Sequence, residues 1–226
     1  MSSSVQVLEL RQRQLRVGQD EAMRTRLHRA LSWLGRAEQE KDDDDARFLF
    51  LWVAFNAAYA GQFNDEGREL LKAGQFIDRL LAPDTQRRIH TVLFERFSGP
   101  VRTLMDNRYV FAPFWHAQAN HDGSERWKQR FEQSKQLAMR ALLDQATDVC
   151  LMLVLERLYV LRNQLVHGGA TWRSSANRSQ LRDGVRLLGT LVPLMLELMM
   201  EADGEQQQGF GAVAYPWLPE LQADRA

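Results

Sequence analysis

The run FLFLWVAF, from Phe48 to Phe55, is the longest uninterrupted apolar stretch of this 226-residue chain and the strongest guide to its fold. A helix over residues 46–60 would be apolar almost all round, so neighbouring helices or a partner subunit must bury most of its sides. Residues 147–166 form a second, nearly all-apolar segment of helical length. Two such helices indicate the centre of a helical bundle or of a contact between subunits.

Outward from these two segments the chain keeps a helical periodicity and shows almost no strand pattern. Apolar residues recur every three or four positions over residues 20–40, with Asp20 as the expected N-cap. Residues 101–123, rich in aromatic side chains, read as irregular or short helical structure. The sequence therefore predicts an all-α, up-and-down bundle of four to six main helices. Its expected parts are a flexible N-terminal arm, mobile or loosely helical (residues 1–19), a helical domain (20–203) and an irregular, extended C-terminal tail (204–226).

Polar residues and glycines indicate where several of these helices begin and end. Asn177, with Gln180 three residues later, has the spacing of a capping box, and Gly168-Gly169 should stop the preceding helix. The acidic run at residues 42–45 suits the positive N-terminal end of the next helix. Four neighbouring carboxylates also suggest a metal site, but consecutive side chains point in different directions and do not converge on one ion. We therefore expect a solvated helix start here rather than a metal site.

Composition narrows the classes of function. Basic and acidic residues balance at 29 each, so any phosphate-binding surface must be a local patch. The sole cysteine, Cys150, lies in an apolar run and reads as a buried thiol rather than a nucleophile. His116 and His121 lack a third ligand at a zinc-binding spacing. The N-terminus shows no signal segment, and the longest apolar run is far shorter than the ~20 residues of a membrane span. These features predict a cytoplasmic protein with no cofactor and no membrane partner.

The segment best suited to chemistry is LRNQLVHGG, residues 161–169, at the end of the second apolar helix. Histidine titrates near neutral pH, so His167 is a candidate general acid or base. The guanidinium of Arg162 is a planar, permanent cation that fits a phosphate, and the Asn163 amide could orient either group. These groups suit cleavage of RNA by its own 2′-hydroxyl. The spacing alone is weak support, because chance matches to so short a motif are expected.

This pattern resembles the HEPN superfamily, whose signature is an arginine, four to six residues and then a histidine, usually with a polar residue directly after the arginine. Arg162, Asn163 and His167 match those three positions. The apolar helix about a hundred residues earlier adds to the likeness, which covers residues 20–200 and points to Apea-like bacterial HEPN proteins.

The resemblance implies a bundle of four or five helices, a homodimer that brings two motifs together, and metal-independent RNA cleavage in many members. Other members bind RNA without cleaving it, or belong to toxin–antitoxin and defence systems. The expected partners are therefore RNA, a second copy of the chain, and an antitoxin or neighbouring defence protein. Some HEPN toxins have a modifiable tyrosine two residues after the histidine. Gly169 stands there in this chain, so that means of control does not carry over.

Structural roles for the same residues stay open at the level of the sequence. Arg162 could pair with a buried acid such as Glu156 or Asp183. The imidazole of His167 could bond the last carbonyls of its helix. In that case the chain would be a non-catalytic binding module or a plain helical scaffold.

Two further questions concern geometry. Five residues along a helix turn about 500°, so Arg162 and His167 on one regular helix would point about 140° apart. Either the helix unwinds over residues 166–168, or two subunits share the site. Asn56, the polar exception in the first apolar helix, either ties two helices together or supports the site, because a buried amide needs hydrogen-bond partners.

Overall fold

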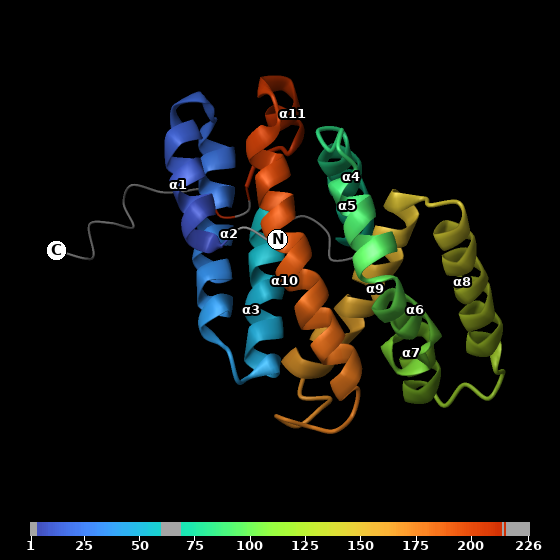
Figure 1. Cartoon of the computed structure of the whole chain (residues 1–226). Helices are drawn as coiled ribbons and strands as arrows, with labels where there is room; N and C mark the ends of the chain where they lie inside the picture. The colour runs from blue at the N-terminus through green and yellow to red at the C-terminus, as the bar shows by residue number, and fades with distance from the viewer. Residues whose placement is uncertain (1–3, 60–68, 214, 216–226) are drawn as a thin grey trace.

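The computed structural model describes residues 4–59, 69–213 and 215, and this part of the chain is all-α, with no strand. The helices pack as a bundle (Figure 1), and six of those described have 13 residues or more. The predicted all-α bundle is therefore confirmed. Its α-helices are α1 (Val5–Leu15), α2 (Glu21–Gln39), α3 (Asp44–Tyr59), α4 (Glu69–Leu81), α5 (Arg88–His90), α6 (Ser98–Asp106), α7 (Ala112–Ala119), α8 (Arg126–Leu143), α9 (Thr147–Val166), α10 (Arg178–Glu201) and α11 (Gly204–Gly209). Short 3-10 segments cover Arg16–Gly18 and Arg108–Val110, and a π-helical segment covers Thr91–Arg96.

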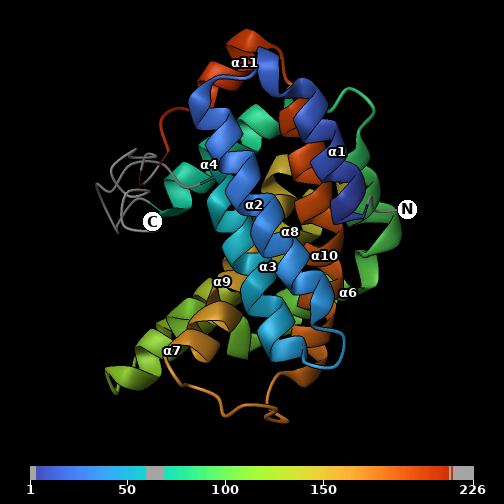
Figure 2. The same ribbon diagram turned by 90° about the vertical axis from the view of Figure 1, so that its left-hand side faces the viewer.

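Helix α3 lies at the centre of this arrangement. It packs mainly against α2 and α10 and also contacts α9 and α4. Figure 1 shows α1 and α2 to one side of α3 and α10, with α6, α7 and α8 to the other. Figure 2, turned by 90°, shows α2 in front of α3. The end of α9 and the start of α3 lie at the same end of the bundle, the lower end in Figure 1.

The apolar run predicted to be central is buried within this one chain. Phe48, Leu51, Trp52 and Phe55 are at most 3% exposed, and no residue of α3 is classed as exposed. Gly184 lets α10 approach closely, because a Cβ there would lie 2.9 Å from Phe48 Cε2. Neighbouring helices thus provide the cover that the all-round apolar pattern requires. Among the described residues, no helix has both the length and the apolar character needed to cross a membrane.

The predicted helix starts are right at α2 and at α10, but the capping box predicted at α10 is absent. The Asp20 carboxylate accepts a hydrogen bond from the backbone N–H of Met23 at 2.7 Å, as an N-cap does. Asn177 precedes α10 with φ +53° and forms no capping box. Its side-chain amide instead donates to Gln164 Oε1 at 3.0 Å, and its oxygen accepts from Asn107 Nδ2 at 3.2 Å. Asn177 therefore links three segments rather than capping one helix.

The N-terminal arm expected over residues 1–19 is helical in its described part and packs on the bundle. Helix α1 contacts α2 and α10, and Val5 and Leu8 are 8% and 1% exposed. The backbone N–H of Val5 donates to Glu38 Oε1 at 3.1 Å. Of the two expectations, a mobile or a loosely helical arm, residues 5–15 are helical, and Val5, Leu8 and a 3.0 Å ion pair between Arg11 and Glu201 hold them on the bundle.

The C-terminal tail begins with a short helix instead of an extended segment. Helix α11 has a capping box formed by Asp203 and Gln206, and Phe210 after it is 6% exposed. Arg26 of α2 holds the next residues: its Nη2 donates to the backbone oxygens of residues 210–212 at 2.9–3.2 Å, and its Nη1 donates to Ala58 O at 3.1 Å. The rest of the expected tail, apart from residues 213 and 215, lies outside the described residues.

Residues 101–123 are short helical structure, which was one of the two expectations for them. They contain most of α6, a 3-10 turn and α7. Helix α6 begins at Ser98, two residues after the π-helical segment ends at Arg96. Pro100 is tolerated there because the first turn of a helix does not use its own N–H groups for helical hydrogen bonds.

Candidate functional site

Helix α9 (Thr147–Val166) carries the candidate motif at its C-terminal end. Leu158 and Leu161 are at most 3% exposed and anchor its last turns in the core. Arg162 and Asn163 are only partly buried, and His167, the C-cap residue, is exposed. Near the other end of the helix, Cys150 is buried as predicted, and burial raises the pKa of its thiol to about 11.

The side chain of Arg162 contacts its own helix rather than an acid. Its Nη1 donates to Asn163 Oδ1 at 3.0 Å, and its guanidinium carbon lies 5.9 Å from the centre of the Tyr159 ring. Across the described residues, Arg162 forms no ion pair with Glu156 or Asp183, so the expected structural alternative is absent there. The cation is positioned by a neutral amide and keeps its charge available to an incoming anion.

The imidazole of His167 is free of hydrogen bonds to the described part of the chain. The backbone N–H of His167 donates to Asn163 O at 3.0 Å, which completes the helix end, but the ring bonds none of the last carbonyls. Gly168 follows with φ +67°, the left-handed conformation that a terminating glycine adopts easily. The predicted glycine stop is confirmed, and it leaves the histidine ring exposed at the tip of a buried helix.

The structure does not bring Arg162 and His167 onto one face of α9. The helix stays regular through Val166, so the two side chains still leave its axis about 140° apart. Departure from helical geometry is confined to the residues after Val166. The two alternatives of the sequence analysis, a helix that unwinds over residues 166–168 and a site shared by two subunits, therefore both stay predictions.

Asn56 takes no part in the motif by hydrogen bonding. Its Oδ1 is buried and, within the described residues, has no hydrogen-bond partner. This oxygen therefore serves neither predicted role of Asn56: it neither ties two helices together nor supports the site. A buried acceptor without a donor lowers stability by about 1–3 kcal/mol.

A cavity of about 610 Å³ opens beside the motif, between α7 and the last turns of α9. This volume is within the range of about 300–1,000 Å³ that small-ligand sites occupy. Its α9 wall includes Glu156, Arg157, Tyr159 and Asn163. The opposite wall, formed by α7 and the residue before it, includes Phe111, Pro113, Trp115 and His116. Arg162 and His167 do not line this cavity, so Asn163 is the residue that links it to the motif.

Arg157 is a nearly fully buried cation at this cavity, only 2% exposed. Its Nη2 donates to Ser134 Oγ at 2.8 Å, and its guanidinium carbon lies 4.6 Å from the centre of the Phe111 ring. Burial lowers the pKa of Arg157 to about 10, partly offset by the charge of Glu156. Burial likewise raises the pKa of Glu156, again opposed by the charge of its neighbour. Two opposite charges thus share one desolvated site without forming an ion pair in the described residues.

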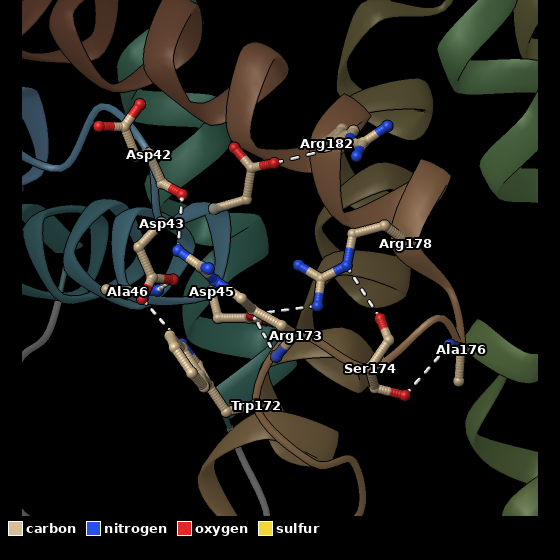
Figure 3. Close-up of polar contacts among 11 residues, drawn as sticks. Asp42, Asp43, Asp45, Ala46, Trp172, Arg173, Ser174, Ala176, Arg178 and Arg182 are labelled. Atoms are coloured by element: carbon tan, nitrogen blue, oxygen red, sulfur yellow. Dashed lines mark hydrogen bonds and ion pairs between the residues drawn. The ribbon is translucent and has the colours of Figure 1, made fainter.

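The loop that follows His167 is tied to the start of α3 by the acidic run (Figure 3). Asp43 accepts a hydrogen bond from Trp172 Nε1 at 2.8 Å with one oxygen and caps α3 with the other. Asp45 Oδ2 accepts from the backbone N–H of Arg173 at 2.9 Å and from Arg178 Nη2 at 3.0 Å. These bonds fix the loop against the core and so limit where the end of α9 can move.

The acidic run is therefore a helix start, as expected, but it is not simply solvated. Asp45 is 5% exposed, because the loop covers it. Asp44 faces Arg182, with 3.6 Å between Oδ2 and Nε. In the part of the chain that the structure describes, no group of three or more histidine, cysteine or acidic residues could hold a metal ion.

The cavity residues were only partly accessible to sequence reasoning. Glu156, Tyr159 and Asn163 are spaced so that they share one face of α9, and polar groups on one face of an otherwise apolar helix are a usable signal. The place of His116 had no such signal, because α7 and α9 are separated by α8 and meet only in the folded chain.

Comparisons of the chain with protein-family models, with curated proteins and with solved structures found no match. The HEPN resemblance accordingly stays a prediction that rests on Arg162, Asn163 and His167 and on the all-α fold.

Proposed function

We propose that this protein is a HEPN-like endoribonuclease that acts without a metal ion and uses Arg162 and His167 as its catalytic pair. The observation that carries the proposal is the exposed, unbonded imidazole of His167 at the tip of a buried helix, one turn beyond the Arg162–Asn163 pair. A histidine held this way is open to a phosphodiester, which a buried or capping histidine would not be.

The reaction needs a general base, a general acid and a cation, and His167 and Arg162 can supply these three roles. The 2′-hydroxyl of RNA attacks the adjacent phosphorus, so the 2′-oxygen–phosphorus bond forms as the bond to the 5′-oxygen breaks. His167 takes the 2′-proton and then delivers it to the leaving 5′-oxygen, since imidazole serves either role near neutral pH. Arg162 stabilises the charge that develops on the phosphoryl oxygens, and Asn163 orients its guanidinium. The products carry a 2′,3′-cyclic phosphate and a 5′-hydroxyl.

The geometry of α9 favours a homodimer for this chemistry. Arg162 and His167 diverge around one helix, so two copies related by a twofold axis could place the arginine of one beside the histidine of the other. Val166 and Trp172, close to His167 in the chain, are 50% and 66% exposed. Apolar groups of this kind beside a motif support its burial against a second copy.

Cleavage of a labelled single-stranded RNA in the presence of EDTA tests the proposal. His167→Ala should lower the rate by about 10²–10⁴-fold, the usual contribution of a general acid or base. His28→Ala is the matched control, because His28 is exposed on α2, outside the motif. Arg162→Ala should likewise slow cleavage, whereas Arg13→Ala, at an exposed position of α1, should not. Equal cleavage by the His167 variant and the wild type, or no cleavage by the wild type, would overturn the assignment.

A non-catalytic RNA-binding or protein-interaction module is the second candidate. It is favoured by the contacts of Arg162 with Asn163 and Tyr159, which hold the cation away from His167. The neutral net charge fits it as well, because no broad basic surface is needed. Salt-dependent RNA binding that His167→Ala leaves intact, with no cleavage product, would support this second function.

A further inference from the structure

The cavity between α7 and α9 has aromatic walls that are held in place from outside it. Trp115 Nε1 donates to Tyr109 O at 2.8 Å, and the Trp115 ring meets that of Phe114 edge-on at 5.1 Å. Across the cavity, the Tyr159 ring packs against Trp52 in the core at 6.1 Å. Rings fixed in this way form a slot for a flat ligand at little cost in side-chain entropy.

The polar groups of the cavity have unused hydrogen-bonding capacity. Arg157 has five N–H donors, yet it gives one hydrogen bond to the described residues, and its buried Nε has no partner there. A charge that is 2% exposed and forms no ion pair within the described residues is costly to keep. The Nη1 of Arg157, which has no hydrogen bond there and is not among the fully buried atoms, is the donor that an acceptor in the cavity could reach. Glu156, next to it, adds acceptors that form no hydrogen bond within the described part of the chain.

The ligand that complements this slot is a planar ring with acceptors on one edge and donors on another. Guanine has the acceptors O6 and N7, which an arginine fork binds with two hydrogen bonds. It also has adjacent donors on N1 and N2, which a carboxylate accepts. Aromatic side chains stack on an unpaired base, as in many single-strand RNA sites. Glu156 and Arg157 together are close to neutral, which fits an uncharged base better than a free anion.

We propose that the α7–α9 cavity binds one unpaired guanine base of an RNA strand, with Arg157 and Glu156 at its edges and Trp115 at its face. This inference rests on the proposed function, since Asn163 belongs both to the cavity and to the motif. The cavity extends along α9 from Glu156 to Gln164, about 12 Å at the helical rise. A base seated there would leave its own phosphate near Asn163, and the cavity would select which phosphodiester reaches Arg162.

Binding to the full-length protein tests the cavity apart from catalysis. The protein is titrated with GMP, AMP, CMP and UMP, and with single-stranded RNA hexamers that contain one guanine or none. Binding is measured by tryptophan fluorescence or by titration calorimetry. We expect GMP and the guanine hexamer to bind at least about 10-fold more tightly than their counterparts, as one good bidentate contact provides. Binding of GMP without a preference among hexamers would assign the cavity to a free nucleotide and overturn the RNA proposal. Equal affinity for all four nucleotides would overturn the proposal altogether.

Two variants with a matched control locate the binding. Trp115→Ala should weaken GMP binding by about 10-fold or more through loss of stacking. Trp33→Ala should not, although Trp33 on α2 is similarly exposed, 40% against 42%. Glu156→Gln keeps the side-chain shape and should reduce the preference for GMP over AMP by about 10-fold, because an amide replaces one acceptor with a donor. Unchanged GMP affinity in both cavity variants would contradict the proposal.

The His167→Ala variant separates failure of the cavity from failure of the nuclease. It should bind GMP like the wild type, because His167 does not line the cavity. Guanine-selective binding without any RNA cleavage would leave the cavity assignment standing and remove the proposed function. Cleavage that shows no guanine preference and is unaffected by Trp115→Ala would leave the proposed function standing and remove the cavity assignment.

Discussion

Replacing Asp45 with alanine should release the loop behind His167 and destabilise the whole bundle. One carboxylate oxygen, Oδ2, accepts both the backbone N–H of Arg173 at 2.9 Å and the Nη2 of Arg178 at 3.0 Å. The Asp45 side chain is 7% exposed and that of Arg178 is 19% exposed. Water can therefore replace the lost acceptor only in part.

The expected magnitude follows from these two bonds. A hydrogen bond to a charged group contributes about 1.5–3 kcal/mol. Arg178 keeps its bond from Nε to Ser174 O at 2.9 Å, and it can turn toward solvent, so part of its loss is recovered. We expect Asp45→Ala to lower the free energy of unfolding by about 3 kcal/mol, and the melting temperature by about 6–12 °C for a chain of this size. Asp45→Asn keeps an acceptor for Arg173 and should lose about half as much.

Urea unfolding of the wild type, the two Asp45 variants and Asp42→Ala provides the measurement. Asp42 is the control, because it is exposed and only its backbone oxygen meets the loop, through Arg173 Nη2 at 3.4 Å. Hydrogen exchange at the Arg173 amide reports the loop itself and should accelerate in Asp45→Ala. If Asp45→Ala and Asp42→Ala unfold within about 0.5 kcal/mol of each other, the range of ordinary surface substitutions, this account of the loop is wrong.

Two further outcomes test the packing and the charges of the bundle. Gly184→Ala should destabilise it by about 1 kcal/mol or more despite the better helix propensity of alanine, because the new Cβ would lie 2.9 Å from Phe48 Cε2. Gly189→Ala, where the nearest atom to the new Cβ lies at 3.9 Å, should stabilise the bundle by up to about 1 kcal/mol. Thermal unfolding of both variants provides the measurement. Burial raises the pKa of Glu156 in the folded chain above its unfolded value, so the free energy of unfolding falls as pH rises between the two values. Glu156→Gln should therefore increase the free energy of unfolding at pH 7 and leave it unchanged at pH 4; an equal gain at both pH values would contradict burial as the cause.

The large-scale fold could be predicted because it depends on local patterns. An eight-residue apolar run needs cover on all sides, and α3 has that cover from α2, α9 and α10. Asp20 and Gly168 mark helix ends through the conformation and hydrogen bonds of single residues, which sequence shows directly. Helix α1 was only one of two alternatives in the sequence, because its polar residues outnumber the few apolar contacts, including Leu8, that hold it.

The site was predictable only where one helix carries it. The sequence of α9 alone identifies Arg162, Asn163 and His167 as candidates. Helical geometry alone predicts that the side chains of Arg162 and His167 diverge. The cavity beside Asn163 depends on where the fold places α7 relative to α9, which no local pattern specifies. Asn177 shows the same limit, since its amide bonds Asn107 and Gln164 from distant segments instead of its own helix.

Arg26 sets the order in which the chain can reach its native state during synthesis. The carbonyls that its Nη2 binds lie 184–186 positions further along, so they leave the ribosome long after α2 and α3. A guanidinium enclosed without its acceptors would weaken the nascent structure by about 3–5 kcal/mol. Helices α2 and α3 can meet early, yet their contact around Arg26 stays unfinished until residues 210–212 have been made. Premature termination would thus leave a cation in the interior and mark the truncated product for proteolysis.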